Sequence, residues 1–170
     1  MVQPPPSLPS RVGSLLDVGC GIRPQGIVES TRYVGVDAHR PYLQQVQPEL
    51  TACTFICGKA SEVLPRLMDN SFDLVLAIDF IEHLTRRSGW AFLREAKRIG
   101  RRVAIFTPLG YMEQSYAPGE LDAWQMDGTH WQTHRSGWTP QDFPGWDIEV
   151  LPDFHDHTVG AFWAVIDTKE

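Results

Sequence analysis

The sequence lacks three features that mark whole classes of protein. Its 170 residues contain no run of about 18 apolar residues, so we expect no membrane-spanning helix and no membrane partner. Cysteine is scarce, and an odd count of three with no leader segment is typical of a reduced, cytoplasmic protein. Basic residues are not in excess, because the net charge at pH 7 is -6, which argues against a nucleic-acid partner.

The composition of the chain is that of one ordinary globular domain. With 42% hydrophobic and 21% charged residues, the chain is long and apolar enough to bury a core. The proline-rich residues 1–13 are predicted to be a flexible lead-in, and residues 14–170 to form the domain. A basic cluster at Arg86, Arg87 and residues 94–102 is interpreted as the solvated face of a helix, with a phosphate site as the alternative.

The hydrophobic pattern predicts an α/β fold. Apolar segments typical of strands lie at residues 14–18, 33–36, 53–57, 72–78 and 102–107. Helical signals between them predict a short helix between residues 26 and 32, a second over 41–46, a third capped by Ser61 and a longer one over 88–99. Such alternation favours a doubly wound, mostly parallel sheet.

The end of the chain departs from this alternation. Two further strands are predicted at residues 147–151 and 161–167, after a short helix capped by Thr139. The link between them, residues 152–160, is too short for a crossover helix, which favours an antiparallel pair. We therefore predict a seven-stranded sheet that ends in an antiparallel hairpin. The His155-Asp156-His157 tip of that hairpin is interpreted as a solvated polar turn.

A glycine turn follows the first predicted strand. Asp17-Val18-Gly19-Cys20-Gly21 ends an apolar run, and Asp37 ends the next strand 20 residues later. Glycines at such a turn let the backbone approach a nucleotide closely, and the acid is placed to accept the two ribose hydroxyls. The alternatives are a plain strand-to-helix turn and a helix cap before Pro41.

Two regions carry side chains suited to chemistry. Glu82-His83 follows the carboxyl end of the fourth predicted strand, where ligand sites form in α/β proteins. Residues 111–138, which we call the cap, are a long connection rich in aromatic residues and are predicted to cover the substrate. The alternative is a packed surface excursion. His130 and His134 in the cap have the spacing of metal ligands on a helix, but the neighbouring glycines and the lack of an acid partner argue against a metal.

These blocks resemble the class I S-adenosylmethionine-dependent methyltransferases. The resemblance rests on residues 16–21, 35–37, 71–84 and 102–108, which occur in the family's order. It implies that Asp17 orders the turn or meets the amino-acid end of S-adenosylmethionine, and that Asp79 faces its sulfonium or ammonium group. The remaining residues that it assigns to the cofactor are Gly19, Cys20 and Gly21 at the turn, Asp37 and Ala38 at the ribose, and Lys59 and Ala60 at the adenine.

The sequence departs from the family pattern at two positions. Arg23, followed by Pro24, stands where the family often has another glycine. Lys59 stands where the family often has an acid that reads the adenine amino group, and a lysine cannot accept a hydrogen bond. Either the backbone around Lys59 and Ala60 reads the adenine, or the alignment is shifted by a residue or two, or cofactor affinity is weak.

The sequence thus predicts methyl transfer from S-adenosylmethionine to an oxygen or nitrogen of a small-molecule acceptor, such as a sugar-like metabolite. His83 and His134 are the candidate catalytic bases, because histidine titrates near neutral pH. Two alternatives stay open: a non-catalytic partner subunit with the same fold, and a nicotinamide-dependent oxidoreductase. A homodimer is also compatible with the sequence.

Overall fold

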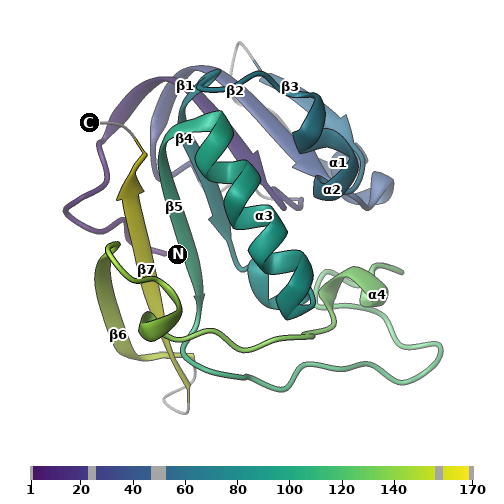
Figure 1. Ribbon diagram of the computed structural model, residues 1–170. Helices are drawn as coiled ribbons and strands as arrows, with labels where there is room; N and C mark the ends of the chain where they lie inside the picture. Colours follow the sequence, from purple (N-terminus) through teal and green to yellow (C-terminus); the bar gives the residue numbers. More distant parts are fainter. Residues whose placement is uncertain (1, 23–25, 47–52, 156–158, 169–170) are drawn as a thin grey trace.

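A seven-stranded sheet forms the centre of the computed structural model, which describes residues 2–22, 26–46, 53–155 and 159–168 (Figure 1). The strands are β1 (Arg11–Val18), β2 (Glu29–Asp37), β3 (Cys53–Cys57), β4 (Phe72–Ile78), β5 (Gly100–Pro108), β6 (Asp147–His155) and β7 (Val159–Asp167). Their order is β3-β2-β1-β4-β5-β7-β6; β7 runs antiparallel to both of its neighbours, β5 and β6, whereas the pairings among β1 to β5 are parallel. The predicted sheet with its C-terminal antiparallel hairpin is confirmed.

The helices are short apart from one. They are α1 (Arg40–Gln45), α2 (Ala60–Val63), α3 (Arg86–Ile99) and α4 (Thr129–Gln132), with single 3-10 turns η1 (Leu64–Arg66), η2 (Ile81–His83) and η3 (Pro140–Asp142). The helix α3 begins two residues before its predicted start, because the Thr85 side chain accepts the Ser88 N–H and caps it. The predicted Ser61 cap is wrong, since Lys59 is the N-cap of α2. No helix of the described residues is long and apolar enough to cross a membrane.

Apolar side chains pack on both faces of the sheet. On the face that α3 covers, Phe92 and Ile99 of the helix join strand residues such as Val75 in one buried cluster. On the other face, Leu76 and Trp163 belong to a second cluster. The N-terminal segment, rather than a long helix, covers part of this second face.

The N-terminal segment, predicted to be a flexible lead-in, packs against the sheet. Val2 and Leu8 are buried in the second cluster. The Trp163 indole N–H donates to the Gln3 carbonyl oxygen at 2.9 Å. Strand β1 also begins at Arg11, three residues before the predicted start. The segment therefore contributes apolar contacts that a flexible lead-in would not make.

The connection between β1 and β2 corrects another prediction. No helix lies among its described residues, and β2 already begins at Glu29, inside the span predicted to be helical. The register pairs Arg11 with Glu29, so the chain must return along the whole length of β1, roughly 25 Å for eight residues. Ten helical residues would span only about 15 Å. The short connection therefore excludes the predicted helix.

The parallel strands place the candidate site at one edge of the sheet. The carboxyl ends of β1, β2 and β4 meet at this edge, which is where ligands bind in open α/β sheets. Figure 1 shows the connection from β5 to β6 passing this edge beyond the end of α3 and returning through α4. Most of this connection is the cap, so the predicted cap lies next to the strand ends that carry the candidate residues.

Candidate active site

A cavity of about 820 Å³ opens between the strand ends and the cap. The predicted residues that line it are Asp17, Gly19, Cys20, Asp37, Ala38, Lys59, Ala60, Asp79, His83 and His134. The remaining predicted residue, Gly21, is buried beside it. The structure thus brings the residues that the sequence singled out to a single cavity.

The two glycines of the turn adopt backbone conformations that favour glycine. Gly19 has a φ of +77° and Gly21 a φ of +59°. A Cβ on Gly19 would lie 2.4 Å from Cδ2 of Phe80, and one on Gly21 would lie 2.6 Å from Cη2 of Trp124. From the sequence, these glycines were interpreted as making room for a nucleotide, with a plain strand-to-helix turn as the alternative. The structure adds that aromatic rings of the protein need the same space.

Asp37 ends β2 and is bound to the glycine turn. Its Oδ2 accepts the Gly21 N–H at 3.0 Å, and its Oδ1 accepts the His39 N–H at 2.8 Å. Burial raises the pKa of the Asp37 carboxyl, and the backbone N–H donors of His39 and Gly21 act in the opposite direction. Each carboxylate oxygen has two lone pairs, so both oxygens can accept a further hydrogen bond from a ligand hydroxyl.

Asp17 is buried at the end of β1. Its Oδ2 accepts the hydroxyl hydrogen of Tyr33, from the neighbouring strand β2, at 2.6 Å. Burial raises the pKa of Asp17 to about 6, although the Tyr33 bond lowers it. Cys20 is also buried, and its pKa is raised by burial, so it stays a thiol at neutral pH. Asp17 is therefore an acid that exchanges its proton near neutral pH at the wall of the cavity.

Asp79 follows β4 in an unusual backbone conformation. Its φ is +47°, a region that L-residues other than asparagine and aspartate rarely adopt. Its N–H donates to the Phe106 carbonyl oxygen at 3.0 Å, which extends the pairing of β4 with β5. The Asp79 residue is exposed toward the cavity. The protein around its carboxyl group nevertheless desolvates it, which raises its pKa to about 7.

Glu82 is a buried acid of this site to which the sequence analysis gave no role. One carboxylate oxygen, Oε2, accepts the Thr107 hydroxyl at 2.9 Å. The other, Oε1, has no hydrogen-bond partner among the described residues. Burial raises the pKa of Glu82 well above its ordinary value, and the charge of Asp79 raises it further. The adjacent pair Glu82-His83 was visible in the sequence, but nothing there showed that the carboxylate points inward.

The two predicted catalytic histidines lie together. The ring centroids of His83 and His134 are 4.9 Å apart. The Nδ1 atom of His134 lies 2.7 Å from the Met112 carbonyl oxygen, and that of His83 lies 3.4 Å from the Thr133 carbonyl oxygen. Burial, followed by the neighbouring His134, lowers the pKa of His83 to about 4. His83 is therefore a neutral imidazole at pH 7.

The geometry of the cap separates His130 from His134. The helix α4 ends at Gln132, so the two histidines do not share a helix as their spacing would require. His130 is exposed, whereas His134 is buried. The metal-binding arrangement considered from their spacing is therefore absent from the described cap.

One buried carboxylate holds the cap to the sheet side of the cavity. The Tyr42 hydroxyl of α1 donates to Asp122 Oδ2. The same carboxylate accepts the backbone N–H groups of Trp124 at 2.8 Å, Met126 at 3.0 Å and Gly128 at 3.1 Å. These bonds outweigh burial and lower the pKa of Asp122. The Trp124 ring packs edge-on against Tyr42, with centroids 4.6 Å apart, so this part of the cap is fixed beside Asp37.

The return limb of the cap is bound to the η2 turn. The Glu82 carbonyl oxygen accepts the N–H groups of Arg135 and Ser136 at 2.8 and 3.1 Å. The Ser136 hydroxyl donates to the Leu84 carbonyl oxygen at 2.7 Å. At the neck of the cap, the Gly110 N–H donates to the Trp138 carbonyl oxygen at 2.7 Å. These contacts, which lie far apart in sequence, position His134 against His83.

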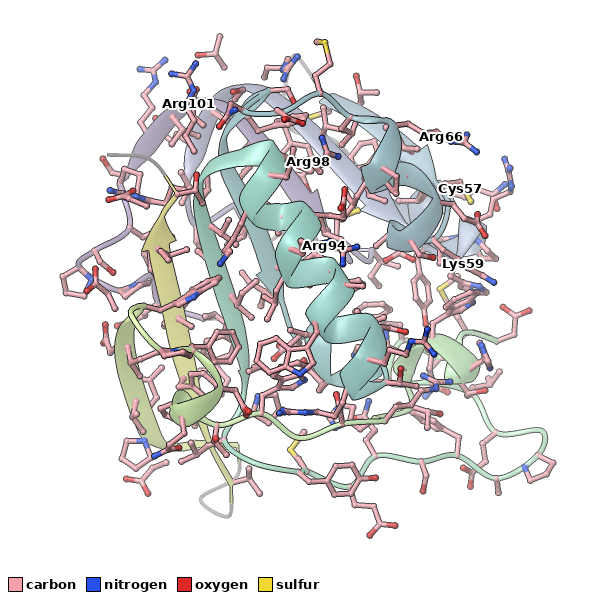
Figure 2. The ribbon with its side chains drawn as sticks, in the orientation of Figure 1. Cys57, Lys59, Arg66, Arg94, Arg98 and Arg101 are labelled. Atoms are coloured by element: carbon pink, nitrogen blue, oxygen red, sulfur yellow. The ribbon has the colours of Figure 1, made fainter. Side chains whose placement is uncertain are left out.

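The basic cluster singled out in the sequence lies along α3 and the start of β5, where Figure 2 labels Arg94, Arg98 and Arg101. Three arginines of the cluster form close ion pairs with carboxylates. These pairs are Arg86 with Asp142, Arg98 with Asp69 and Glu95, and Arg102 with Asp167. Arginines already bound by carboxylates are poor candidates for a phosphate site, which favours the solvated-face interpretation. Lys59, at the start of α2, has its Nζ 6.0 Å from the centroid of the Trp131 ring in the cap.

Comparison with known proteins identifies the fold and a family. The model of the methyltransferase domain family matches residues 16–106, more than half of the chain. No curated protein matches the sequence significantly. The sequence match includes the glycine turn, Asp37, Asp79 and the Glu82-His83 pair, and it ends within β5, before the cap.

Solved methyltransferase structures share the architecture. A protein of Listeria monocytogenes assigned as an S-adenosylmethionine-dependent methyltransferase superposes with a TM-score of 0.66 at 10% identity, over 96% of this chain and 94% of that one. A SAM-dependent methyltransferase from Methanosarcina mazei gives 0.64 at 14% identity, over 96% and 97%. Phosphoethanolamine N-methyltransferase 2 of Haemonchus contortus, in complex with phosphomonomethylethanolamine and S-adenosylhomocysteine, gives 0.61 at 14% identity, over 92% and 49%. At these identities the likeness establishes the fold.

Proposed function

This chain belongs to the methyltransferase domain family, and on that premise we propose that it transfers a methyl group from S-adenosylmethionine to an oxygen or nitrogen of a small-molecule acceptor. The observation that carries the proposal is the cavity of about 820 Å³ with the glycine turn and Asp37 on one side and the two histidines on another. When bound, S-adenosylmethionine supplies an electrophilic methyl group on a sulfonium, whose leaving group is a neutral thioether.

The residues at the carboxyl ends of β1 and β2 fit the adenosyl part of this cofactor. Asp37 keeps lone pairs on both oxygens after its bonds to Gly21 and His39, so it can accept two ribose hydroxyls. Lys59 and Ala60 line the neighbouring wall, where the adenine would lie. Because the lysine side chain accepts no hydrogen bond, the backbone of this segment is the group left to read the adenine.

The acids around Gly19 fit the charged end of the cofactor. Asp17 lies behind the turn and Asp79 faces the cavity, so both can attract a sulfonium or an ammonium group. Their raised pKa values reflect surroundings that favour the neutral acid, and a bound cation would favour the carboxylate instead. Asp79 also lines the same cavity as the two histidines.

The cap supports a small acceptor. Its Asp122 and Tyr42 contact on one side, and its bonds to Glu82 on the other, make it a packed wall of the cavity. A cavity of this volume is typical of sites for small ligands, and closure excludes water from the reacting groups. The enzyme's main contribution would be to hold the donor and the acceptor in line.

The histidines differ in what they can contribute as bases. A base works best when its pKa lies near the working pH, so the pKa of about 4 makes His83 a weak proton acceptor. Its lone pair remains able to accept a hydrogen bond from an acceptor hydroxyl or amine. We therefore propose that His83 positions the acceptor rather than serving as the leading base that the sequence predicts.

A labelling experiment tests the proposal. The purified chain is incubated with S-adenosylmethionine carrying an isotopically labelled methyl group and with a small-molecule extract, and the products are analysed by mass spectrometry. We expect label in one or a few small molecules, and none with the Asp37→Ala variant. Label found only in protein or nucleic acid would contradict the acceptor class. Absence of any transfer, together with absence of S-adenosylmethionine binding, would favour the non-catalytic partner subunit.

A further inference from the structure

Three possible metal ligands meet at the acceptor side of the cavity. One nitrogen each of His83 and His134 and one carboxylate oxygen of Glu82 all lie within 4.8 Å of one another. All three residues line the cavity, and Glu82 and His134 are buried. Two imidazoles and one carboxylate are a donor set that divalent transition-metal ions bind in proteins, with further positions open to substrate or water.

The hydrogen bonds of the histidines are those that orient metal ligands. A carbonyl oxygen only accepts, so the Nδ1 atom of His134, 2.7 Å from the Met112 carbonyl oxygen, carries the proton. The Nδ1 atom of His83 lies 3.4 Å from the Thr133 carbonyl oxygen, which is a longer contact. In the His134 ring Nε2 is then the nitrogen with the lone pair. Metal-binding histidines typically donate their other N–H to a backbone carbonyl or carboxylate, which fixes the ring and the tautomer.

The carboxylate of Glu82 provides an independent indication of a ligand. Glu82 is 2% exposed, and its Oε1 has no hydrogen-bond partner among the described residues. Leaving a buried carboxylate oxygen without a partner is costly, and such groups need an explanation in a native structure. The Thr107 hydroxyl binds the other oxygen, so the side chain is held in place while Oε1 is left to bind something else.

From this arrangement we infer that Glu82, His83 and His134 bind one divalent transition-metal ion, through a carboxylate oxygen and one ring nitrogen of each histidine. Ligands about 2.1 Å from a common ion lie roughly 3 to 4 Å apart, so small side-chain rotations close the present spacing. This site differs from the His130 and His134 pair considered from the sequence. The sequence alone did not indicate this site, because His134 lies some fifty residues from Glu82 and His83.

The site would select the methyl acceptor, a role that rests on the proposed function. An ion at this point has open positions facing the cavity, where it can bind an acceptor oxygen and hold it against the methyl group. A bound divalent ion also lowers the pKa of a hydroxyl or water that it binds. The inferred acceptor class is therefore a small molecule that offers a hydroxyl to the metal, and the protein would not need a histidine base.

Cobalt binding tests the inference without reference to activity. The full chain is freed of metal with a chelator and titrated with Co²⁺, which absorbs visible light when it is bound by imidazole nitrogen. We expect one equivalent to bind to the wild type, and Glu82→Gln and His134→Ala each to lower the affinity at least about tenfold. His130→Ala is the matched control, because it removes an exposed histidine of the same cap and should leave Co²⁺ binding unchanged.

Each other outcome has a definite meaning. Failure of the wild type to bind Co²⁺, equal binding by the cluster variants, or loss of binding in His130→Ala would each overturn the site. Circular dichroism shows whether the variants are folded, and Glu82→Gln keeps the volume of the side chain. Binding of S-adenosylhomocysteine, measured in the presence of the chelator, separates the two proposals. If it binds while Co²⁺ does not, the metal site fails and the proposed function stands. The reverse result overturns the proposed function, and with it the role in selecting the acceptor, but leaves the metal site standing.

Discussion

The Gly21 N–H donates a hydrogen bond to Asp37 Oδ2 over 3.0 Å, so the turn after β1 and the acid at the end of β2 are one unit. Trp124 of the cap lies directly above the same glycine. Asp37 is therefore oriented by the turn, and the turn is covered by the cap. A change at Gly21 should disturb the acid and the cap together.

Gly21→Ala should destabilise the protein more than backbone strain alone explains. The new Cβ would lie 2.6 Å from the Trp124 ring, and the residue would have to keep a φ of +59°. We expect a loss in free energy of unfolding of about 1–2 kcal/mol from the conformation and roughly another 1–3 kcal/mol from the clash. Urea denaturation, followed by the fluorescence of the six tryptophans, measures the loss.

Gly26→Ala is the matched control for this change. Gly26 has nearly the same φ, +63°, but among the described residues no atom lies within 4 Å of the position of its Cβ. It should therefore show the conformational cost alone, about 1–2 kcal/mol, with an unchanged fluorescence spectrum. Equal losses in the two variants would show that Trp124 does not need the space above Gly21.

Tyr42→Phe should loosen the cap. It removes the hydroxyl that donates to the buried Asp122 carboxylate, and a hydrogen bond to a charged group contributes about 1.5–3 kcal/mol. We expect a loss of that size in the free energy of unfolding and faster hydrogen exchange at the N–H groups of Trp124 and Gly128. Tyr111→Phe removes an exposed hydroxyl of the same cap and should change stability by less than about 0.5 kcal/mol. Unchanged exchange in Tyr42→Phe would contradict the role of this contact.

Ionisation of Asp17 should lower the free energy of unfolding as the pH rises from about 4 to 6. The folded protein keeps the Asp17 proton up to about pH 6, whereas the unfolded chain releases it near the ordinary aspartate pKa of 3.8. Folding therefore favours the protonated form, and this contribution is full below pH 3.8 and lost above pH 6. Since one pKa unit corresponds to 1.36 kcal/mol, the change across this window is about 3 kcal/mol.

The Asp17→Asn variant isolates this effect. Its free energy of unfolding, relative to that of the wild type, should rise by about 3 kcal/mol between pH 4 and pH 7, as measured by urea denaturation across the range. Tyr33→Phe removes the hydrogen bond that lowers the Asp17 pKa, so it should move the transition to higher pH. Parallel profiles of the wild type and Asp17→Asn would contradict the raised pKa.

The sequence predicted the parts of the fold that depend on local patterns. Uniform apolar runs gave the strands β3 and β4 with the bounds that the structure shows. The shortness of the predicted link, residues 152–160, indicated the antiparallel hairpin, because no crossover helix fits there. The helix predicted near Gly26 failed, since the distance that the chain must return along β1 depends on how β1 and β2 pair.

The sequence predicted the site residues that directly follow strand ends. It did not predict the contacts that the cap brings together. Asp37 and His83 could be placed from their position after predicted strands. The contact of Tyr42 with Asp122, 80 residues apart, has no local signature. The inward direction of Glu82 also depends on the packing of Thr107 and of the cap, which sequence periodicity does not encode.

Isothermal titration calorimetry with S-adenosylhomocysteine tests the central claim most directly. The wild type should bind it, and Asp37→Ala should bind at least about tenfold more weakly, because it loses the carboxylate that accepts the ribose hydroxyls. Asp153→Ala, on β6 and exposed, is the control and should bind like the wild type. Absence of binding to the wild type, or equal affinity in Asp37→Ala, would contradict the assignment of the cavity to this cofactor.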